Sequence, residues 1–329
     1  MKNQITISDI AKRAEVSKTT ISRFLNGNYT HMSEKTREKI SEIVKDLDYR
    51  PSKQAQGLKN KKSWLIGLLV ADIENLYTAY IIKYIQDELF NSGYQLVIMN
   101  SDNSEEKEKL SIQELIDQNV EGIILQPVSS ELESFQLIEK LGVKTILIDR
   151  KLKGSTWPSV ESDNENATGG LVEYLWKKGY QRVVFVTQEI GQLSVRQERF
   201  NGAKIAADKR NLDFYCLELG EGGRHDLSEY VKKLDFSLRT VFIGSNGNAL
   251  RDIILILNQE GLKFPEICGV SGYDDWFWAE LITPQVSNIR QNPEQLGKKA
   301  VQNLLELIDG KEVWSKTVIK SIFIERQSL

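Results

Sequence analysis

From Trp64 onward, short apolar runs alternate with longer segments in which apolar residues recur every three or four positions. The longer segments predict amphipathic helices, among them Leu76–Asn91, Glu105–Gln118, Asn248–Glu260 and Pro293–Ile308. The short runs predict buried strands at Leu65–Val70, Gln95–Met99, Gly122–Leu125, Thr145–Ile148, Arg182–Val186, Phe214–Glu218, Thr240–Ile243 and Ile267–Ser271. This alternation is typical of α/β folds with parallel sheets, and eight such strands favour two similar lobes over one sheet.

The first 50 residues follow a different pattern, that of three short helices. Thr6 is expected to cap the first helix, with Asp9 closing a capping box, and Ser17 and Ser33 are expected to cap the second and third. Gly27 suits the left-handed end of the second helix. The exposed face of that helix carries Lys18, Thr19, Ser22 and Arg23. Such cations and short polar groups contact phosphates and base edges, although a generic three-helix domain with a solvated polar face would look similar.

Charge divides the chain at nearly the same place. Residues 1–62 carry 14 Lys and Arg against 7 Asp and Glu, whereas the other 267 residues carry 29 against 39. This asymmetry indicates a small module that meets a polyanion and a larger module with another role.

Several classes of protein are disfavoured by what the sequence lacks. No apolar run approaches the roughly 20 residues that span a bilayer, and the first residues lack a signal-peptide core, so we expect a cytoplasmic protein without a membrane partner. Cys216 and Cys268 are too few for a zinc site, and both are expected to be buried. His31 and His225 lack a catalytic or metal-binding context. We therefore expect no metal and no cofactor.

Polar side chains follow several of the predicted strands. They are Asp72, Gln126, Asp149, Arg150, Ser245, Asn246, Asp274 and Asp275, while Arg196 and Arg199 open the helix after the fifth strand. Ligands of parallel sheets bind beyond the carboxyl ends of the strands. Each residue alone is compatible with loop solvation or helix capping, but their recurrence favours a site for a polar ligand. Tyr77 and the aromatics Trp276, Phe277 and Trp278 are expected to form either an apolar platform there or part of the core.

The segments ITISDIAKRAEVSKTTISRFLNG and SEKTREKISEIVKDLDYRPS resemble the headpiece of the lactose/galactose-repressor family of bacterial transcription regulators. The resemblance covers essentially the whole chain. It implies that the second helix enters the major groove, where Lys18, Thr19 and Arg23 read bases and Arg23 can bind guanine through two hydrogen bonds. The implied set of DNA contacts is Thr6, Ser17, Lys18, Thr19, Thr20, Ser22, Arg23, Asn26 and Leu58.

Residues 51–62 form a basic linker after Tyr49-Arg50-Pro51. By resemblance this is a hinge helix that folds on DNA and wedges Leu58 into the minor groove. Gln56 and Gly57 depart from the Arg and Ser that are usual there, and a glycine disfavours the helix off DNA.

The resemblance also implies a domain plan. A headpiece (1–50) and a hinge (51–62) precede a two-lobed module (63–329), which is like a periplasmic binding protein. Lobe 1 takes about 63–161 and 292–320, and lobe 2 takes about 162–290 and 321–329. The chain is expected to cross between the lobes near Glu161–Glu165, Ile289–Asn292 and Val318–Ile322, with a strand beginning near Val318.

The family's sugar-binding positions correspond to Asp149, Arg199, Asn246 and Asp274. The full predicted effector site is Asp72, Tyr77, Gln126, Asp149, Arg150, Arg196, Arg199, Asn246, Asp274 and Trp276. Ser-Asn-Gly at 245–247 and GYDDWFWAELITP resemble the branch that responds to ketodeoxygluconate and related acids. Arg150 adds a cation that a neutral sugar does not need, so we expect an anionic sugar acid.

Together these features predict a DNA-binding transcription regulator, and more specifically a repressor of carbohydrate-utilisation genes. Its homodimer would read a pseudo-palindromic operator, with dimer contacts along Leu76–Ile85 and Leu250–Asn258. A sugar-binding receptor is the alternative, but it would need an export signal and no basic headpiece. An enzyme acting on sugars would need a phosphate loop, metal-spaced carboxylates or a base–nucleophile pair. The sequence has no Gly-rich phosphate loop, and although Asp274-Asp275 resembles a carboxylate pair, adjacent residues seldom face one substrate together.

Overall fold

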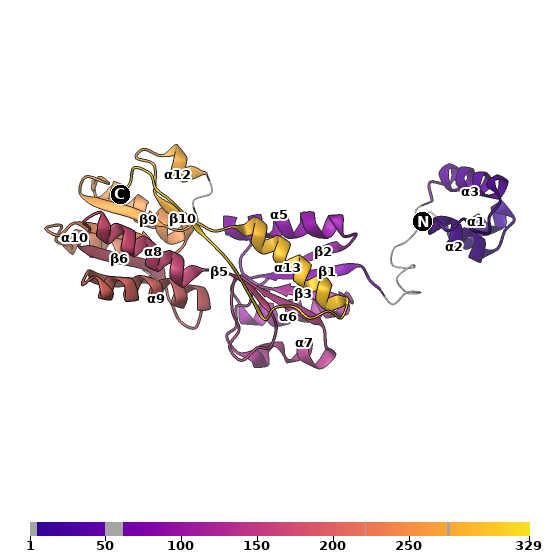
Figure 1. The fold of residues 1–329 in the computed structure, drawn as a ribbon, viewed down its shortest axis with the longest axis horizontal. Helices are drawn as coiled ribbons and strands as arrows, with labels where there is room; N and C mark the ends of the chain where they lie inside the picture. The colour runs from indigo at the N-terminus through magenta and orange to yellow at the C-terminus, as the bar shows by residue number, and fades with distance from the viewer. Residues whose placement is uncertain (1–4, 50–61, 221, 275–276) are drawn as a thin grey trace. The chain divides into compact units, whose positions relative to one another are not determined.

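A computed structural model describes residues 5–49, 62–220, 222–274 and 277–329 (Figure 1). The chain divides into two compact units, Met1–Trp64 and Leu65–Leu329. Leu58 and nearly all of the predicted hinge lie outside the described residues, as do Asp275 and Trp276.

The first unit contains three helices, α1 (Ile7–Ala14), α2 (Lys18–Leu25) and α3 (Glu34–Asp46). The three predicted caps are confirmed, since the side chains of Thr6, Ser17 and Ser33 each accept a hydrogen bond from the backbone N–H three residues later. Gly27 has the predicted left-handed backbone, with φ of 71°. Ile10, Ile21 and Ile40 are fully buried in a small core between the helices.

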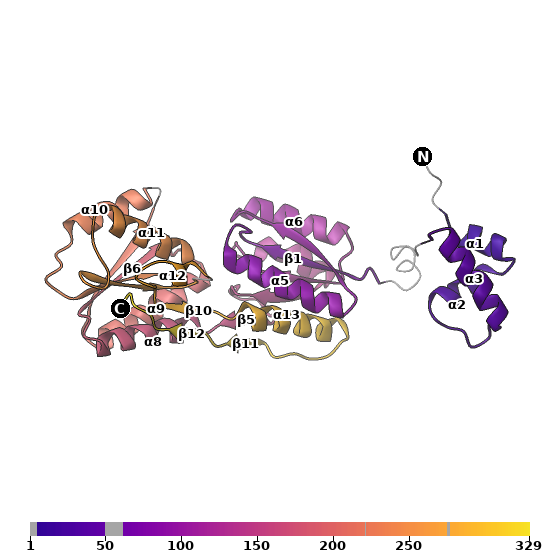
Figure 2. The ribbon, with the colours of Figure 1, turned by 90° about the horizontal axis from the view of Figure 1, so that it is seen from above.

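The first lobe of the second unit is built on a parallel sheet in the order β11-β5-β4-β3-β1-β2. Its strands are β1 (Leu65–Val70), β2 (Gln95–Asn100), β3 (Gly122–Leu125), β4 (Lys144–Ile148), β5 (Ser159–Ser162) and β11 (Lys316–Ile319). One face packs on the paired helices α5 (Leu76–Asn91) and α13 (Pro293–Ile308), as Figure 2 shows. The other face packs on α6 (Glu105–Asp117) and α7 (Gln136–Leu141), with the 3₁₀ turn η1 (Leu132–Phe135) before α7.

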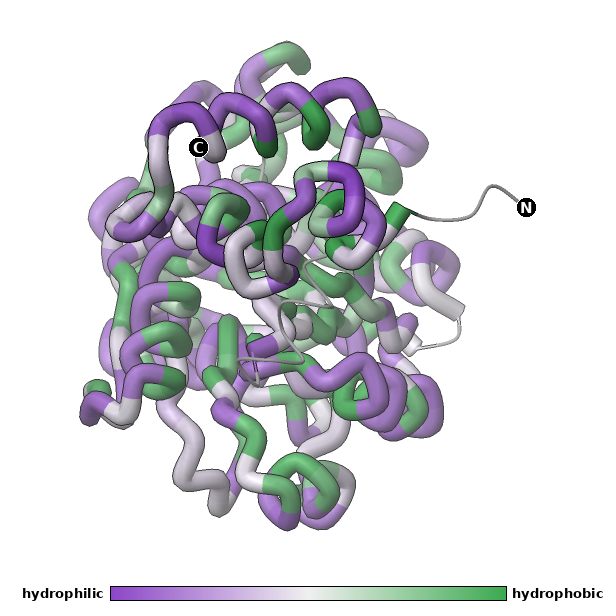
Figure 3. The backbone as a smooth tube through the Cα atoms, turned by 90° about the vertical axis from the view of Figure 1, so that its right-hand side faces the viewer, coloured by the Kyte–Doolittle hydropathy of each residue, from purple (hydrophilic) through white to green (hydrophobic). Residues whose placement is uncertain are grey.

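The second lobe has a parallel sheet in the order β7-β6-β8-β9. Its strands are β6 (Arg182–Gln188), β7 (Asp213–Leu219), β8 (Thr240–Gly244) and β9 (Cys268–Gly272). Helices α8 (Asn164–Lys177) and α9 (Ser194–Lys209) cover one face. Helices α10 (Arg224–Lys233), α11 (Gly247–Gln259) and α12 (Trp278–Leu281) cover the other. Green and purple alternate along the helices in Figure 3, as expected where one side of a helix packs on a sheet.

The described chain passes between the lobes three times. It leaves β5 for α8, returns from β10 (Asn288–Arg290) to α13, and leaves β11 for β12 (Ile322–Ile324), which pairs antiparallel with β10. Strands β5 and β11 lie side by side up to the pair Ser162 and Ile319 (Figure 2). Each crossing is therefore a short segment between a strand and the next helix or strand. Three such connections suit a hinge motion of the lobes.

The predicted α/β class with two parallel-sheet lobes is confirmed. Strand ends differ by one or two residues, and the strand expected near Val318 begins at Lys316. Three short strands, β5, β10 and β12, were not predicted. Strands β5 (Ser-Val-Glu-Ser) and β10 (Asn-Ile-Arg) lack an apolar run, and β12 (Ile-Phe-Ile) has only three residues. The prediction that both cysteines are buried was wrong for Cys216, which is exposed on the edge strand β7, whereas Cys268 is buried.

Candidate functional site

The headpiece presents a polar face on α2. Lys18, Thr19 and Arg23 are exposed and Ser22 is half-buried, and none of the four side chains forms a hydrogen bond or ion pair with the described residues. Ser17 and Thr20 open the helix, and their hydroxyl oxygens lie 2.9 Å apart. Thr6 and Asn26 are exposed at helix ends. Among the predicted DNA contacts, the side chains of Lys18, Thr19 and Arg23 are therefore free to bind DNA, whereas the hydroxyls of Thr6 and Ser17 also cap helices.

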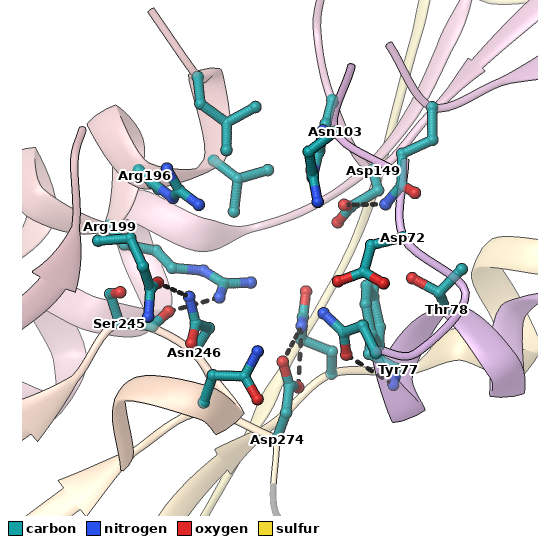
Figure 4. A pocket seen from close by; sticks show the side chains of 18 residues that line it. Asp72, Tyr77, Thr78, Asn103, Asp149, Arg196, Arg199, Ser245, Asn246 and Asp274 are labelled. Carbon is teal, nitrogen blue, oxygen red and sulfur yellow. Dashed lines mark hydrogen bonds between the residues drawn. The ribbon is translucent and has the colours of Figure 1, made fainter. Parts of the chain in front are cut away.

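A cavity of about 260 Å³ opens between the two lobes of the second unit, at the carboxyl ends of both sheets (Figure 4). All nine predicted effector residues that the structure describes line it. The first lobe contributes Asp72, Tyr77, Gln126, Asp149 and Arg150, and the second contributes Arg196, Arg199, Asn246 and Asp274. Trp276, the tenth, lies outside the described residues. Neither Phe277 nor Trp278 lines the cavity; Phe277 is exposed and Trp278 packs against the core under α11.

Further lining residues were not in the predicted site: Asn75, Thr78, Asn103, Gln188, Leu193, Val195, Ser245, Asn248 and Gln291. Three of them follow the same strand-end rule that found the others. Ser245, which the sequence already placed after a predicted strand, directly follows β8, Gln188 ends β6, and Asn103 comes shortly after β2. Gln291 lies in the crossing from β10 to α13, which sequence alone does not connect to the cavity.

On the first-lobe wall, Asp149 is held by Gln126. The Gln126 amide nitrogen donates to Asp149 Oδ2 at 2.9 Å, and the Gln126 amide oxygen accepts the N–H of Ala71 at 3.1 Å. Asp149 Oδ1 is buried and has no hydrogen-bond partner among the described residues. A buried acceptor without a partner costs about 1–3 kcal/mol, so a hydroxyl bound in the cavity would be stabilised by donating to it.

Tyr77 lies on the same wall and is 3% exposed. Burial, with the negative charges of Asp149 and Asp274, raises the pKa of the Tyr77 phenol well above its ordinary value. The phenol is therefore neutral at neutral pH.

On the second-lobe wall, Arg199 is 3% exposed and fixed on three sides. Its Nε donates to Asn164 Oδ1 at 2.8 Å, its Nη1 donates to the Ser245 carbonyl at 2.6 Å, and its guanidinium lies 3.7 Å from the centre of the Tyr273 ring. Stacking on an aromatic ring stabilises a desolvated cation. The Arg199 Nη2 donates no hydrogen bond to the part of the chain that the structure describes, so it is available to a ligand.

Asn246 and Asp274 are also positioned by neighbours. Asn246 caps α11 by accepting the Ala249 N–H at 3.0 Å, and its amide nitrogen donates to Gln188 at 2.6 Å. Both carboxylate oxygens of Asp274 accept from the Gln291 amide nitrogen at 2.9 Å. Asp274 in the second lobe is thus tied to one of the crossings.

Two further arginines face the cavity from opposite lobes. Arg150 donates to the Pro127 carbonyl at 3.1 Å, and Arg196 donates to the Glu189 carbonyl at 2.5 Å. Burial lowers the pKa of both guanidinium groups, and the positive charges of Arg150 and Arg199 lower that of Arg196 further. The negative charges of Asp149, Glu108 and Asp72 act in the opposite direction at Arg150, as do those of Glu189 and Glu218 at Arg196. Both side chains remain protonated, because arginine does not lose its proton in proteins. The cavity walls carry three carboxylates and three guanidinium groups, at Asp72, Asp149, Asp274, Arg150, Arg196 and Arg199.

Comparison with known proteins identifies the family. Residues 6–52 match the model for bacterial regulatory proteins of the lacI family, and residues 172–329 match that for a periplasmic binding protein-like domain. The HTH-type transcriptional regulator KdgR of Bacillus subtilis is 32% identical over 331 residues, which cover 98% of this chain and 97% of KdgR. The chain belongs to the lacI family. It is therefore a DNA-binding transcription regulator and not an enzyme, and the receptor alternative is not favoured.

Other relatives and one solved structure agree. The ribose operon repressor of Bacillus subtilis is 31% identical, over 96% of this chain and 95% of its own. The crystal structure of a lac repressor dimer bound to operator and an anti-inducer has the same fold, with a TM-score of 0.87 at 22% identity over 99% of both chains. The similarity to KdgR also supports the branch to which the sequence analysis pointed. None of the described helices is both long and apolar enough to cross a bilayer.

Proposed function

We propose that this lacI-family regulator is a homodimeric repressor of carbohydrate-utilisation genes whose operator affinity depends on a sugar acid bound between its lobes. The observation that carries the proposal is the pair Arg150 and Arg196, two desolvated cations that face one cavity from opposite lobes. A carboxylate accepts hydrogen bonds from both and offsets their repulsion. A neutral sugar also accepts hydrogen bonds through its hydroxyl oxygens, but it carries no negative charge to offset the repulsion between the two cations.

The rest of the ligand is a polyhydroxylated chain or ring. Its hydroxyls donate to Asp149 and Asp274 and accept from Arg199 and Asn246, while Asp72, Gln126 and Tyr77 border the same space. The unpartnered Asp149 Oδ1 is the acceptor that gains most from such a hydroxyl. The resemblance to the ketodeoxygluconate-responsive branch agrees with this chemistry.

Operator recognition belongs to the headpiece. In this proposal Lys18, Thr19 and Arg23 of α2 contact bases, whereas Thr6, Ser17, Thr20, Ser22 and Asn26 contact phosphates. Leu58, in the hinge, inserts into the minor groove. The domain plan is a headpiece (1–50), a hinge (51–62) and an effector module (63–329) in which lobe 1 takes 63–161 and 292–320.

Dimer formation would use α5 and α11. Leu76 on α5 is 46% exposed and Leu255 on α11 is 37% exposed, although each helix buries its other face in its own lobe. Two headpieces on a symmetric dimer match a pseudo-palindromic operator.

The test begins with an operator selected from random duplex DNA by the purified protein. Operator affinity is then measured by fluorescence anisotropy, at one salt concentration, across a panel of sugar acids and their neutral aldose counterparts. We expect an acid to change the affinity and its aldose to have no effect. A response to aldoses alone would reject the anionic effector.

A further inference from the structure

Lys151, next to Arg150, joins the two lobes outside the effector cavity. Its backbone N–H donates to Ser194 Oγ at 2.9 Å, at the first residue of α9. Its ammonium group forms an ion pair with Glu198, also on α9, and lies 3.2 Å from Glu161 Oε2 on β5. One residue of the first lobe thus holds α9 of the second through both backbone and side chain.

Glu161 explains why Lys151 stays in place. The Glu161 side chain is only 2% exposed, and besides Lys151 it has Lys316 of β11 at 3.3 Å and the Ser159 hydroxyl at 2.5 Å. Burial lowers the pKa of Lys151, but Glu198 and Glu161 together raise it above its ordinary value. A buried carboxylate that loses a cationic partner is destabilised, so Lys151 cannot leave this position without cost.

The same network reaches the effector cavity. Asn164 is the first residue of α8, directly after the crossing from β5, and is 1% exposed. Its amide nitrogen donates to Glu198 Oε2 at 3.2 Å, and its Oδ1 accepts from Arg199 Nε at 2.8 Å. An ion pair and two hydrogen bonds therefore connect Lys151 through Glu198 and Asn164 to Arg199.

We propose that the Lys151–Glu198 ion pair is an interlobe clamp, positioned by Asn164, that couples occupation of the cavity to the angle between the lobes. Opening the lobes separates Lys151 from Glu198. A ligand that holds Arg199 fixes Asn164 and hence the carboxylate that Lys151 must meet, so binding and closure favour each other. The coupling to ligand rests on the proposed function, whereas the clamp itself does not.

The clamp is tested first without ligand, through the distance between the lobes. One spin label is attached to the exposed Cys216 of the second lobe and one to Lys140→Cys on α7 of the first. Labelled protein is diluted with unlabelled protein so that only distances within one protomer are measured. Lys151→Met is expected to lengthen and broaden the distance distribution.

The matched control is Lys204→Met, which removes an ion pair with Asp208 on the outer side of the same helix α9. It should leave the distribution as in the parent, and Lys151→Arg should restore it. An unchanged distribution in Lys151→Met, or an equal change in Lys204→Met, overturns the clamp.

The coupling is tested with the sugar acid that the parent protein binds. Lys151→Met and Glu198→Gln should each weaken binding about tenfold, and the double variant should be no weaker than either single one. Fully additive losses overturn the coupling. If no sugar acid binds the parent protein, the proposed effector fails, while the distance measurement still decides the clamp.

Discussion

Asp149 and Asp274 occupy equivalent places in the two lobes, each just beyond the carboxyl end of a sheet strand, and both have a left-handed backbone, with φ of 66° and 59°. Aspartate tolerates this conformation better than most residues, yet it still costs about 1 kcal/mol. Both side chains line the cavity, so the strained turns aim one carboxylate from each lobe at the same ligand.

This pairing predicts that Asp149→Asn separates binding from folding. Asparagine also tolerates the left-handed backbone and keeps the shape of the side chain, so we expect the free energy of unfolding to change by less than about 1 kcal/mol. Sugar-acid binding should weaken at least about tenfold, because a buried acceptor is lost. Urea unfolding and calorimetric titration measure the two quantities. A normal affinity would show that Asp149 does not meet the ligand.

The two cavity-facing cations predict how the protein selects its ligand. Arg150→Gln and Arg196→Gln should each weaken binding of the acid by about 1.5–3 kcal/mol, as expected for a hydrogen bond to a charged group. In both variants, the ratio of the affinity for the acid to that for its neutral aldose should be smaller than in the parent protein. The matched control is Lys109→Gln on α6, which removes a cation of the first lobe outside the cavity. Equal losses for acid and aldose would contradict a carboxylate at these residues.

The exposed face of α2 predicts a selective effect on DNA. Arg23→Ala should weaken specific operator binding by about 1–3 kcal/mol and nonspecific binding much less, because a bidentate contact to guanine is lost. Lys35→Ala on α3, which also removes one positive charge from the headpiece, should weaken specific and nonspecific binding alike. Competition assays with operator and random duplexes separate the two kinds. A uniform loss in Arg23→Ala would mean that it contacts only phosphate.

For Leu58, which lies outside the described residues, the expectation comes from the sequence. Leu58→Ala should reduce both operator affinity and the bend in the bound DNA, because no apolar wedge then enters the minor groove. Effector binding should be unchanged. Gel mobility of circularly permuted operator fragments measures the bend, and a parent-like bend would reject the wedge.

Most of the cavity was predictable from sequence because parallel strands end at a common edge. Apolar runs located the strands, and the polar residues that follow them, such as Asp72 and Gln126, converge as expected. The features that could not be predicted depend on the order of strands in the sheet and on contacts between residues far apart in the sequence. Cys216 is exposed because β7 is an edge strand. Glu198 meets Lys151 across 47 residues, through a crossing whose polar strand β5 has no hydrophobic signature.

The most direct measurement is operator affinity with and without the sugar acid, in the parent protein and in Arg199→Ala. In the parent, the acid should change the affinity at least about fivefold, the lower end of typical allosteric coupling. In Arg199→Ala the acid-free affinity should be retained and the change should vanish. A parent protein indifferent to every acid, or a normal dose response in Arg199→Ala, would contradict the account.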